Sequence, residues 1–303
     1  MLLPLFSLLP SPLTWFGRLA SILLYTGLDS LTADCLHQIA ESGAACTSRS
    51  FRSPRKDRTW KSISVAAVYL FNPFTLLACL GRPSSVFTTL FTVLSISHAC
   101  QARIVTAAFA LAMASYISLH PLLLLPPIGM LCYDQLCLQA AGGSGQAATD
   151  NHSTENAPTT RKVATDQRTQ PKALAFAAKI LGTFVAALAF LFTLSRLILP
   201  SWNFIPSVYM TPLTLPDLTP NPGLWWYFFI EMFDAFREFF LGVFWLHMLS
   251  YSVPFCLRFQ KQPLAAVMLM IGVIAIFEPY ANAGDAGAWL SCVCSIGHVF
   301  EGT

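Results

Sequence analysis

Acidic residues directly follow a dense aromatic run at one place in this sequence. Glu231 and Asp234 are three residues apart, Asp234 and Glu238 are four apart, and Arg237 lies beside them. If residues 224–240 form one helix, the three acids share a face of it. Such a face predicts a polar site at a membrane surface that meets a lipid headgroup. The alternative is a solvated face on an interfacial helix whose rings lie at headgroup level. The aromatic candidates are Trp225, Trp226, Tyr227, Phe228, Phe229, Phe233 and Phe236.

No catalytic motif accompanies this segment. The six histidines are not spaced as the HxxH or HExxH pairs that zinc hydrolases need, and no GxSxG, P-loop or GxGxxG motif occurs. Asp29 and Asp34 are five apart and do not form the DxD pair of a metal-using glycosyltransferase. Cys292 and Cys294 form a CxC without a second pair at metal spacing. The sequence therefore predicts no catalytic residue, no metal site and no cofactor.

The composition indicates a membrane protein. Of 303 residues, 55% are hydrophobic and only 11% are charged, against about 25% charged residues in soluble domains. A soluble fold of this length would need more charge to cover its surface. The basic residues follow the expected membrane topology rather than an aromatic-interleaved patch, so no nucleic-acid partner is expected.

Charge-poor apolar runs predict an all-α, polytopic bundle of about eight membrane spans. His120-Pro121 divides the longest run, because proline disfavours helix in the residue before it. The expected spans are 13–31, 62–81, 84–101, 104–119, 121–137, 176–199, 237–257 and 263–277, and 288–300 is either a partial span or an interfacial helix.

The basic residues predict the orientation of the spans. Segments 49–61 and 161–172 hold six and four Lys/Arg, and the positive-inside rule places both in the cytosol. Four expected spans separate them, which agrees with this placement. The next span then carries residues 200–236, which contain no Lys or Arg, to the far side of the membrane.

These features divide the chain into three parts. Residues 1–138 hold N-terminal membrane helices with the basic loop 49–61, and residues 174–303 hold C-terminal membrane helices. Residues 139–173 are rich in Gly, Ala, Ser and Thr and lack apolar periodicity, so they are expected to be a disordered cytosolic linker.

A proline-rich loop, 200–223, lies on the expected far side, ahead of segment 224–240. Proline fixes φ and removes backbone donors, so this loop is expected to be extended and semi-rigid. Asp217 and Asn221 flank a turn-like Thr-Pro within it. The loop is either a shaped platform for a ligand or partner or a stiff connector.

Several blocks of the sequence occur together in a known family. The blocks are YLFNPFTLLAC with Asn72 and Pro73, SYISLHP with His120 and Pro121, SWNFIP with Trp202 and Pro206, LPDLTPN and GLWWYFFIEMF. In order over about residues 11–291, interrupted by 139–173, they resemble the phosphatidylinositol-glycan class U proteins, the U subunits of the glycosylphosphatidylinositol (GPI) transamidase. The first block is shared more loosely with GPI mannosyltransferases of the GT-C class.

The resemblance implies a GT-C-like bundle that has lost its own chemistry and lies in the endoplasmic reticulum membrane. The transamidase cleaves a C-terminal signal from a proprotein and joins the new C-terminus to the ethanolamine of a GPI lipid. Its nucleophile belongs to a separate caspase-like subunit. The implied role is a non-catalytic subunit that binds or presents the GPI lipid, with that lipid, the membrane and the other subunits as partners.

The resemblance also gives the aromatic-acidic segment a role. Residues 225–236 are similar to a stretch of fatty-acid elongases, which implies recognition of long-chain lipid. Glu231, Asp234 and Arg237 would face the inositol, glucosamine and ethanolamine of the headgroup, or another subunit. The amines of the headgroup are cationic, so carboxylates suit them.

Two other functions stay open. A GT-C mannosyltransferase that uses a polyprenyl-phosphate sugar needs an acidic motif in a first lumenal loop. A small-solute transporter needs internal repeats and broken helices around a midplane site, and the sequence contains no repeat. Family members begin earlier and continue past Thr303, and 139–173 is an insertion, so the chain is expected to be a shortened or divergent form.

Overall fold

The computed structural model describes residues 14–54, 59–146, 172–199, 201–215, 219–221 and 223–296. Helices dominate this part of the chain, which confirms the prediction of an all-α protein. The strands found there are two residues long and pair antiparallel as a small hairpin. The elements are α1 (Trp15–Glu41), β1 (Thr47–Ser48), β2 (Phe51–Arg52), α2 (Ser62–Phe71), α3 (Pro73–Gly81), α4 (Ser85–Cys100), α5 (Ile104–Ile117), η3 (His120–Leu124), α6 (Leu125–Gln146), α7 (Ala173–Ile198), η4 (Pro206–Met210), α8 (Thr211–Thr214), α9 (Leu224–Ile230), α10 (Asp234–Arg258), α11 (Pro263–Phe277) and α12 (Ala283–Cys294).

Four of the described helices are long and apolar enough to cross a membrane. They are α1, the η3–α6 helix over His120–Ala141, α7 and α10. The pair α2 and α3 meets the same criteria as one span bent by 53°. Helices α4, α5 and α11 are also apolar but have only 16, 14 and 15 residues, about 21–24 Å of helix. This set of apolar helices indicates a membrane protein.

Two breaks that the local sequence dictates shape the bundle. Proline is favoured in the first turn of a helix, where its missing amide has no intrahelical partner. Pro73 therefore begins α3, and the Asn72 side chain caps that helix by accepting a hydrogen bond from its first turn at 3.0 Å. At the second break α5 ends at Ile117, and the chain passes through η3 into α6. The prediction that His120-Pro121 divides this run is confirmed.

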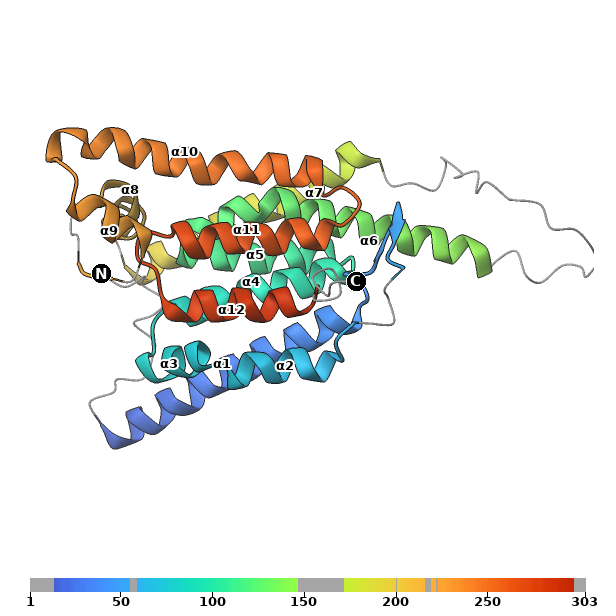
Figure 1. Cartoon of the computed structure of the whole chain (residues 1–303), viewed down its shortest axis with the longest axis horizontal. Coiled ribbons are helices and arrows are strands. Elements are labelled where there is room, and N and C mark those ends of the chain that lie inside the picture. The colour runs from blue at the N-terminus through green and yellow to red at the C-terminus, as the bar shows by residue number, and fades with distance from the viewer. Residues whose placement is uncertain are drawn as a thin grey trace, which may run out of the picture.

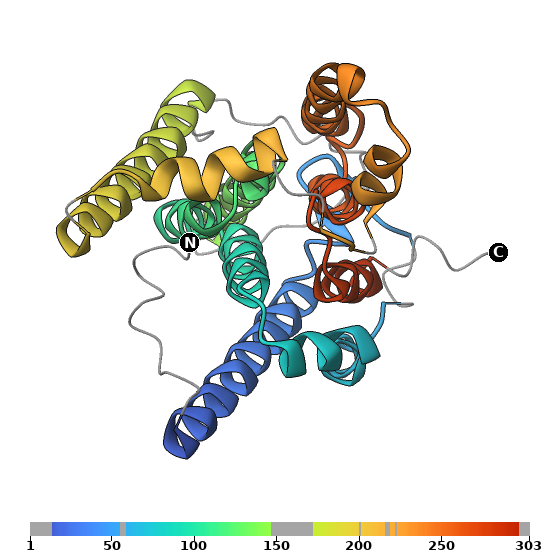
Figure 2. The same cartoon turned by 90° about the vertical axis from the view of Figure 1, so that its left-hand side faces the viewer.

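The helices run roughly along the long axis of the molecule (Figure 1). The centre is formed by α4, α5, α6 and α11. α1 packs against α2 and α4, and α3 packs against α12. α7 lies outside α5, and α10 lies outside α11, on two further sides of the bundle (Figure 2).

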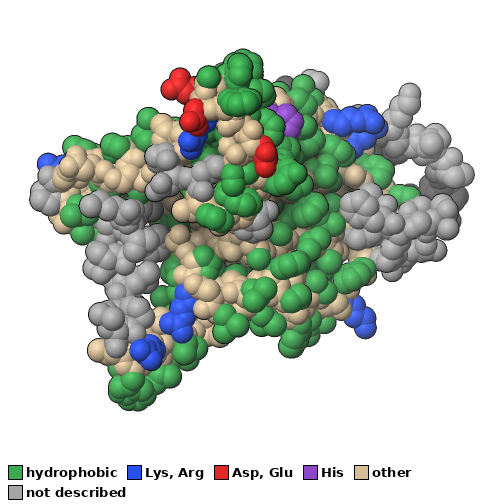
Figure 3. Space-filling view, turned by 60° about the vertical axis from the view of Figure 1, so that its left-hand side comes forward, with side chains coloured by type: hydrophobic (Ala, Val, Ile, Leu, Met, Phe, Trp, Pro, Cys, Tyr) green, Lys and Arg blue, Asp and Glu red, His purple; other side chains and the backbone are tan. Residues whose placement is uncertain are grey.

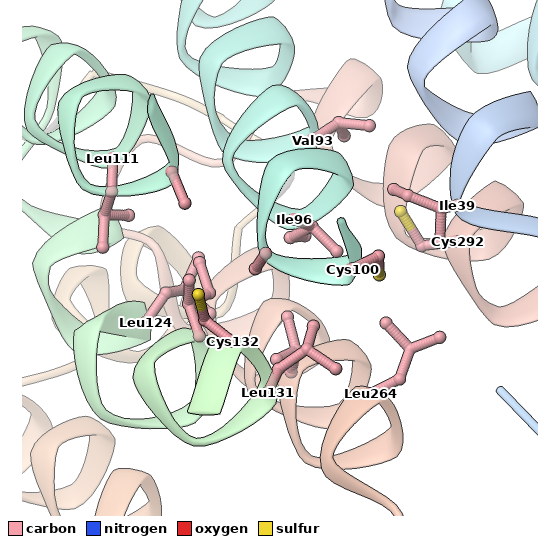
Figure 4. Close-up of a cluster of buried hydrophobic side chains, with 14 of the residues drawn as sticks. Ile39, Val93, Ile96, Cys100, Leu111, Leu124, Leu131, Cys132, Leu264 and Cys292 are labelled. Atoms are coloured by element: carbon pink, nitrogen blue, oxygen red, sulfur yellow. The ribbon is translucent and has the colours of Figure 1, made fainter. Parts of the chain in front are cut away.

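The main core lies where α4, α6 and α11 meet. Figure 4 shows Ile96 of α4, Leu131 of α6 and Leu264 of α11 around one shared interior space, and all three are buried. α5 joins this core through a face of small residues, including Ala107, Ala108 and others of its alanines. Lipid chains are as apolar as these side chains, so close packing of small residues rather than the hydrophobic effect holds such helices together.

The two ends of the bundle carry different segments. At the end with β1 and β2, Ser48 Oγ donates to the Lys261 carbonyl at 2.6 Å, and the Arg49 amide donates to Asp134 Oδ1 at 3.0 Å. We call this the hairpin end, and it carries Arg49 and Arg52 of the hairpin together with Lys261. The opposite end holds α8, α9 and the start of α10 (Figure 1). We call it the cavity end.

Two sequence expectations differ from the structure at this level. α6 continues to Gln146, into the segment predicted as a linker, and residues 147–171 lie outside the described part. The proline-rich loop is not extended throughout, because residues 206–214 form η4 and α8. Pro206 and Pro212 lie in the first turns of these elements, where a missing amide breaks no hydrogen bond.

Candidate functional site

The aromatic-acidic segment folds as two helices that meet at a corner. α9 ends at Ile230, α10 begins at Asp234, and Phe233 between them has an extended backbone. The prediction that Glu231, Asp234 and Glu238 lie on one face of a single helix is therefore wrong. A carboxylate is stabilised at a helix N-terminus, so Asp234 favours a new helix start over continuation of α9.

The rings of this segment divide between the interior and the surface. Trp225 and Phe229 are buried. The Trp225 ring meets Phe244 and Trp245 of α10 edge-to-face, with centroids 5.0 and 6.0 Å apart. These inner rings fix α9 against α10. Trp226 and Phe228 are half-buried, and Tyr227, Phe233 and Phe236 are exposed.

A groove of about 240 Å³ lies in the corner between α9 and α10. We call it the aromatic groove. Its surface is almost entirely apolar, which suits a hydrocarbon chain better than a polar headgroup. The structure thus brings together a large part of the predicted site. The groove is lined by Tyr227, Phe228, Glu231, Met232, Phe233, Phe236 and Phe240.

The charged residues of the segment do not form a pocket. Glu231 and Asp234 are exposed, and Arg237 donates a hydrogen bond to the Leu215 carbonyl. Exposed carboxylates are screened by water, so they contribute little to binding a cation. The face shown in Figure 3 is largely hydrophobic, and the acidic side chains visible on it gather near its top.

A larger cavity, of about 420 Å³, opens at the same end of the bundle. We call it the polar cavity. Its wall is built from the start of α4, the α5–η3 connection, η4 with α8, the end of α11 and the start of α12. Its volume lies within the roughly 300–1,000 Å³ typical of small-ligand sites. The polar residues in its wall are Ser84, Ser85, Thr88, Thr89, Thr92, Ser118, His120, Ser207, Thr211, Glu278, Tyr280, Asn282 and Asp285.

Three titratable side chains, His120, Glu278 and Asp285, line this wall. His120 Nδ1 lies 3.5 Å from Glu278 Oε1 and 3.2 Å from Ser118 Oγ. Thr89 Oγ1 donates to Asp285 Oδ1 at 3.4 Å. His120 Nε2 and Asp285 Oδ2 are buried and have no hydrogen-bond partner among the described residues. Buried polar atoms are normally satisfied, so this wall has capacity for a ligand. No group of three His, Cys, Asp or Glu that could hold a metal ion occurs in the described part of the chain.

Burial sets the protonation of the two acids. It raises the pKa of Glu278 well above its ordinary value, and the nearby Asp285 carboxylate raises that pKa further. Burial also raises the pKa of Asp285 to about 6, opposed by the hydrogen bond from Thr89. Two carboxylates in one buried site repel each other unless a cation joins them.

An aromatic stack connects the predicted segment to the polar cavity. The His120 ring stacks on Trp245 with centroids 5.1 Å apart and an angle of 15°. Trp245 in turn meets Trp225 of α9. The aromatic segment therefore packs, through Trp245, against a residue of the cavity wall.

Two other predicted positions hold neighbouring segments around the cavity. Asn72, beside Pro73, donates through Nδ2 to the Gly287 carbonyl of α12 at 3.3 Å. Asn221 donates through Nδ2 to the Pro279 carbonyl, in the α11–α12 connection, at 3.4 Å. Both amides thus tie distant segments to the part of the chain that carries the two acids.

The remaining predicted residues lie around the same end or outside the described part. Pro121 is buried beside His120 in the cavity wall. Pro206 begins η4, whose following residues line the cavity. Trp202 is exposed, with the Arg196 guanidinium 5.9 Å from its ring centroid. Asp217 lies outside the described residues.

Sequence reasoning did not select Glu278 or Asp285. Glu278 directly follows the apolar run of α11, and Asp285 lies in the first turn of α12. A carboxylate beside a membrane helix is costly unless it is functional or paired. That cost is the signal in the sequence that could have identified them.

Known proteins are similar in sequence to this chain over most of its length. The family profile described as "GPI transamidase subunit PIG-U" matches residues 1–303. The GPI-anchor transamidase component PIGU of Homo sapiens is 30% identical over 250 residues, which cover 82% of this chain and 51% of that protein. The GPI transamidase component GAB1 of Saccharomyces cerevisiae is 33% identical over 229 residues, which cover 74% of this chain and 48% of that protein. The chain spans about half the length of these curated relatives.

Proposed function

The chain belongs to the PIG-U family of GPI transamidase subunits, and from this premise we propose that it is a non-catalytic transamidase subunit that recognises the GPI lipid. In this role it presents the lipid for attachment to the new C-terminus of a proprotein. The nucleophile belongs to another chain, a caspase-like subunit, which is one of its partners. The complex lies in the membrane of the endoplasmic reticulum.

The pairing of an apolar groove with a polar cavity carries this proposal. A GPI lipid has hydrocarbon chains at one end and a polyhydroxylated, amine-bearing headgroup at the other. The aromatic groove suits the chains, and the polar cavity suits the headgroup. Trp245 contacts His120 of the cavity wall and Trp225 of α9, the helix whose Tyr227 and Phe228 line the groove. A GPI lipid bound at this end would place its hydrocarbon chains in the aromatic groove and its headgroup in the polar cavity.

The proposed topology has eight crossings and a GT-C-like arrangement. α4, α5 and α11 are shorter than the ~30 Å hydrocarbon core requires, but they lie mostly inside the bundle. Their ends meet protein rather than lipid, where irregular backbone is tolerated. With these three counted, the hairpin end faces the cytosol and the cavity end faces the lumen.

A GT-C mannosyltransferase is the second candidate, because the polar cavity holds two buried carboxyl groups. General acid–base catalysis uses positioned carboxyl groups such as those of Asp and Glu. Glu278 and Asp285 are two such groups in the wall of one cavity.

Depletion of the protein separates the two functions. Cells would be labelled with inositol, and their GPI intermediates resolved. We expect complete, ethanolamine-bearing GPI to accumulate while proproteins keep their C-terminal signals. Accumulation of under-mannosylated GPI would instead make the protein a glycosyltransferase.

Complementation of the depleted cells tests the aromatic groove itself. Tyr227 and Phe236 are 70% and 56% exposed, so serine at both positions should leave the fold intact and lower GPI attachment severalfold. Leu246→Ser is the matched control, since Leu246 is 66% exposed on α10 but does not line the groove. Full attachment with the double variant would remove the groove from the proposal.

A further inference from the structure

The polar cavity holds two acidic side chains that have few partners from the protein. Glu278 and Asp285 both line it, and the Asp285 carboxylate raises the pKa of Glu278. Glu278 lies beside the imidazole of His120, and Asp285 accepts a hydrogen bond from the hydroxyl of Thr89. Asp285 Oδ2 is left buried without a partner among the described residues. The group that best completes this arrangement is a cation.

The acceptors in the cavity wall indicate which kind of cationic group would fit there. A primary ammonium donates three hydrogen bonds in different directions. Asp285 Oδ2 and the Glu278 carboxylate supply acceptors in the cavity wall, and the unpartnered His120 Nε2 is a third buried polar atom in the same wall. The imidazole is held in place by its stack on Trp245, so it offers a fixed contact rather than a mobile one.

The rest of the wall suits a polyhydroxylated body for that amine. Ser84 before α4, and Ser85 and Thr88 of α4, line the cavity with their hydroxyls. Ser207 and Thr211 line it from η4 and α8. Hydroxyls both donate and accept, so they match the hydroxyls of a sugar or an inositol. The cavity volume of about 420 Å³ leaves room for a sugar-sized group rather than a bare ion.

We infer that the polar cavity binds the primary ammonium of an amine-bearing headgroup between Glu278 and Asp285, with His120 and the surrounding hydroxyls holding the polar body that carries it. The choice of headgroup rests on the proposed function, in which two amines are available: glucosamine next to the inositol, and phosphoethanolamine. The hydroxyl lining favours glucosamine. This moves the cation-binding role from the exposed Glu231 and Asp234, where the sequence placed it, to two largely buried acids that line a cavity.

A matched pair of probes tests the amine contact without any mutation. The full chain, with the subunits that copurify with it, would be placed in lipid nanodiscs. Titration calorimetry would compare glucosaminyl-inositol with N-acetylglucosaminyl-inositol, which differs only by the acetyl group that removes the positive charge. We expect the acetylated probe to bind at least tenfold more weakly, and phosphoethanolamine to compete weakly or not at all.

Variants then assign the contact to the two acids. Asp285→Asn and Glu278→Gln should each weaken glucosaminyl-inositol binding about tenfold or more and leave the acetylated probe unchanged. Glu41→Gln is the matched control, because Glu41 is an exposed acid on α1 far along the chain from the cavity segments. Retention of acetylated-probe binding shows that each variant is folded.

Each outcome decides the inference. Equal affinity for the two glucosaminyl probes, or affinity that neither variant changes, overturns it, as does binding of Mn²⁺ in place of the amine. Binding of phosphoethanolamine but not of glucosaminyl-inositol supports the ammonium site and assigns its source to ethanolamine. Failure of the proposed function is seen separately, as under-mannosylated GPI in the depleted cells, whichever way the probes bind.

Discussion

Replacement of Asp285 by asparagine is expected to stabilise the unliganded protein near neutral pH. Burial raises the pKa of Asp285 from its ordinary 3.8 to about 6. One pKa unit corresponds to ~1.36 kcal/mol, so the charged form of this group destabilises the folded protein by on the order of 3 kcal/mol. Asparagine carries no charge and keeps an oxygen that accepts the Thr89 hydrogen bond, so the variant escapes this destabilisation.

The same shift fixes the direction of the pH dependence. As the pH rises from about 4 to about 6, the unfolded chain releases the Asp285 proton before the folded chain does. Stability is therefore fully present below the ordinary pKa and is lost as the pH rises through the folded value. The titratable groups around Asp285 are Glu278, which shifts in the same direction, His120 and Tyr280. The variant should match the wild type near pH 4 and exceed it near pH 7.

The apparent melting temperature of the full chain in detergent, with its copurifying subunits and without any amine, measures this effect. A change of ~1 kcal/mol shifts the melting temperature by about 2–4 °C in larger domains, so a gain of several degrees is expected near neutral pH. Glu41→Gln should show no such gain, since Glu41 is exposed and pairs with His37 at 3.7 Å. A less stable Asp285→Asn protein near pH 7, or a wild-type profile without a fall between about pH 4 and 6, would refute the reasoning.

Three further predictions use the same melting assay. Gly287→Ala should lower stability by ~1–3 kcal/mol, because the added Cβ would lie 2.9 Å from a side-chain carbon of α3; Gly242→Ala, which enters open space on α10, is the control and should be neutral or slightly stabilising. Trp225→Ala should remove ~3–5 kcal/mol because the ring is fully buried, whereas Tyr227→Ala should change stability by less than ~0.5 kcal/mol; equal losses would contradict the division into inner and outer rings. Asn72→Ala should cost ~1 kcal/mol through loss of the α3 cap, and an unchanged melting temperature would contradict that role.

Much of this protein could be predicted because the relevant physics is local. The transfer of apolar side chains out of water depends on each run by itself, so the long spans and the membrane class are evident in the sequence. Proline acts on its own turn and on the residue before it, so the break at His120-Pro121 was predicted. The same rule applies at Asn72-Pro73, where residues 62–81 were expected to form one uninterrupted span but form two helices bent by 53°. The same local rules did not separate α9 from α10, because residues 231–233, which lie between the two helices, contain no proline or glycine.

The polar cavity depended on the tertiary structure. Thr89 and Asp285 are 196 residues apart in the chain, yet their side chains meet. Glu278 meets His120 only because α11 ends beside η3. The sequence by itself determined the apolar helices, the break at His120-Pro121 and the family; the tertiary structure alone decided which carboxylates lie together in the polar cavity. Burial and proximity are what raise their pKa values, and both are properties of neighbours that one position in a sequence does not reveal.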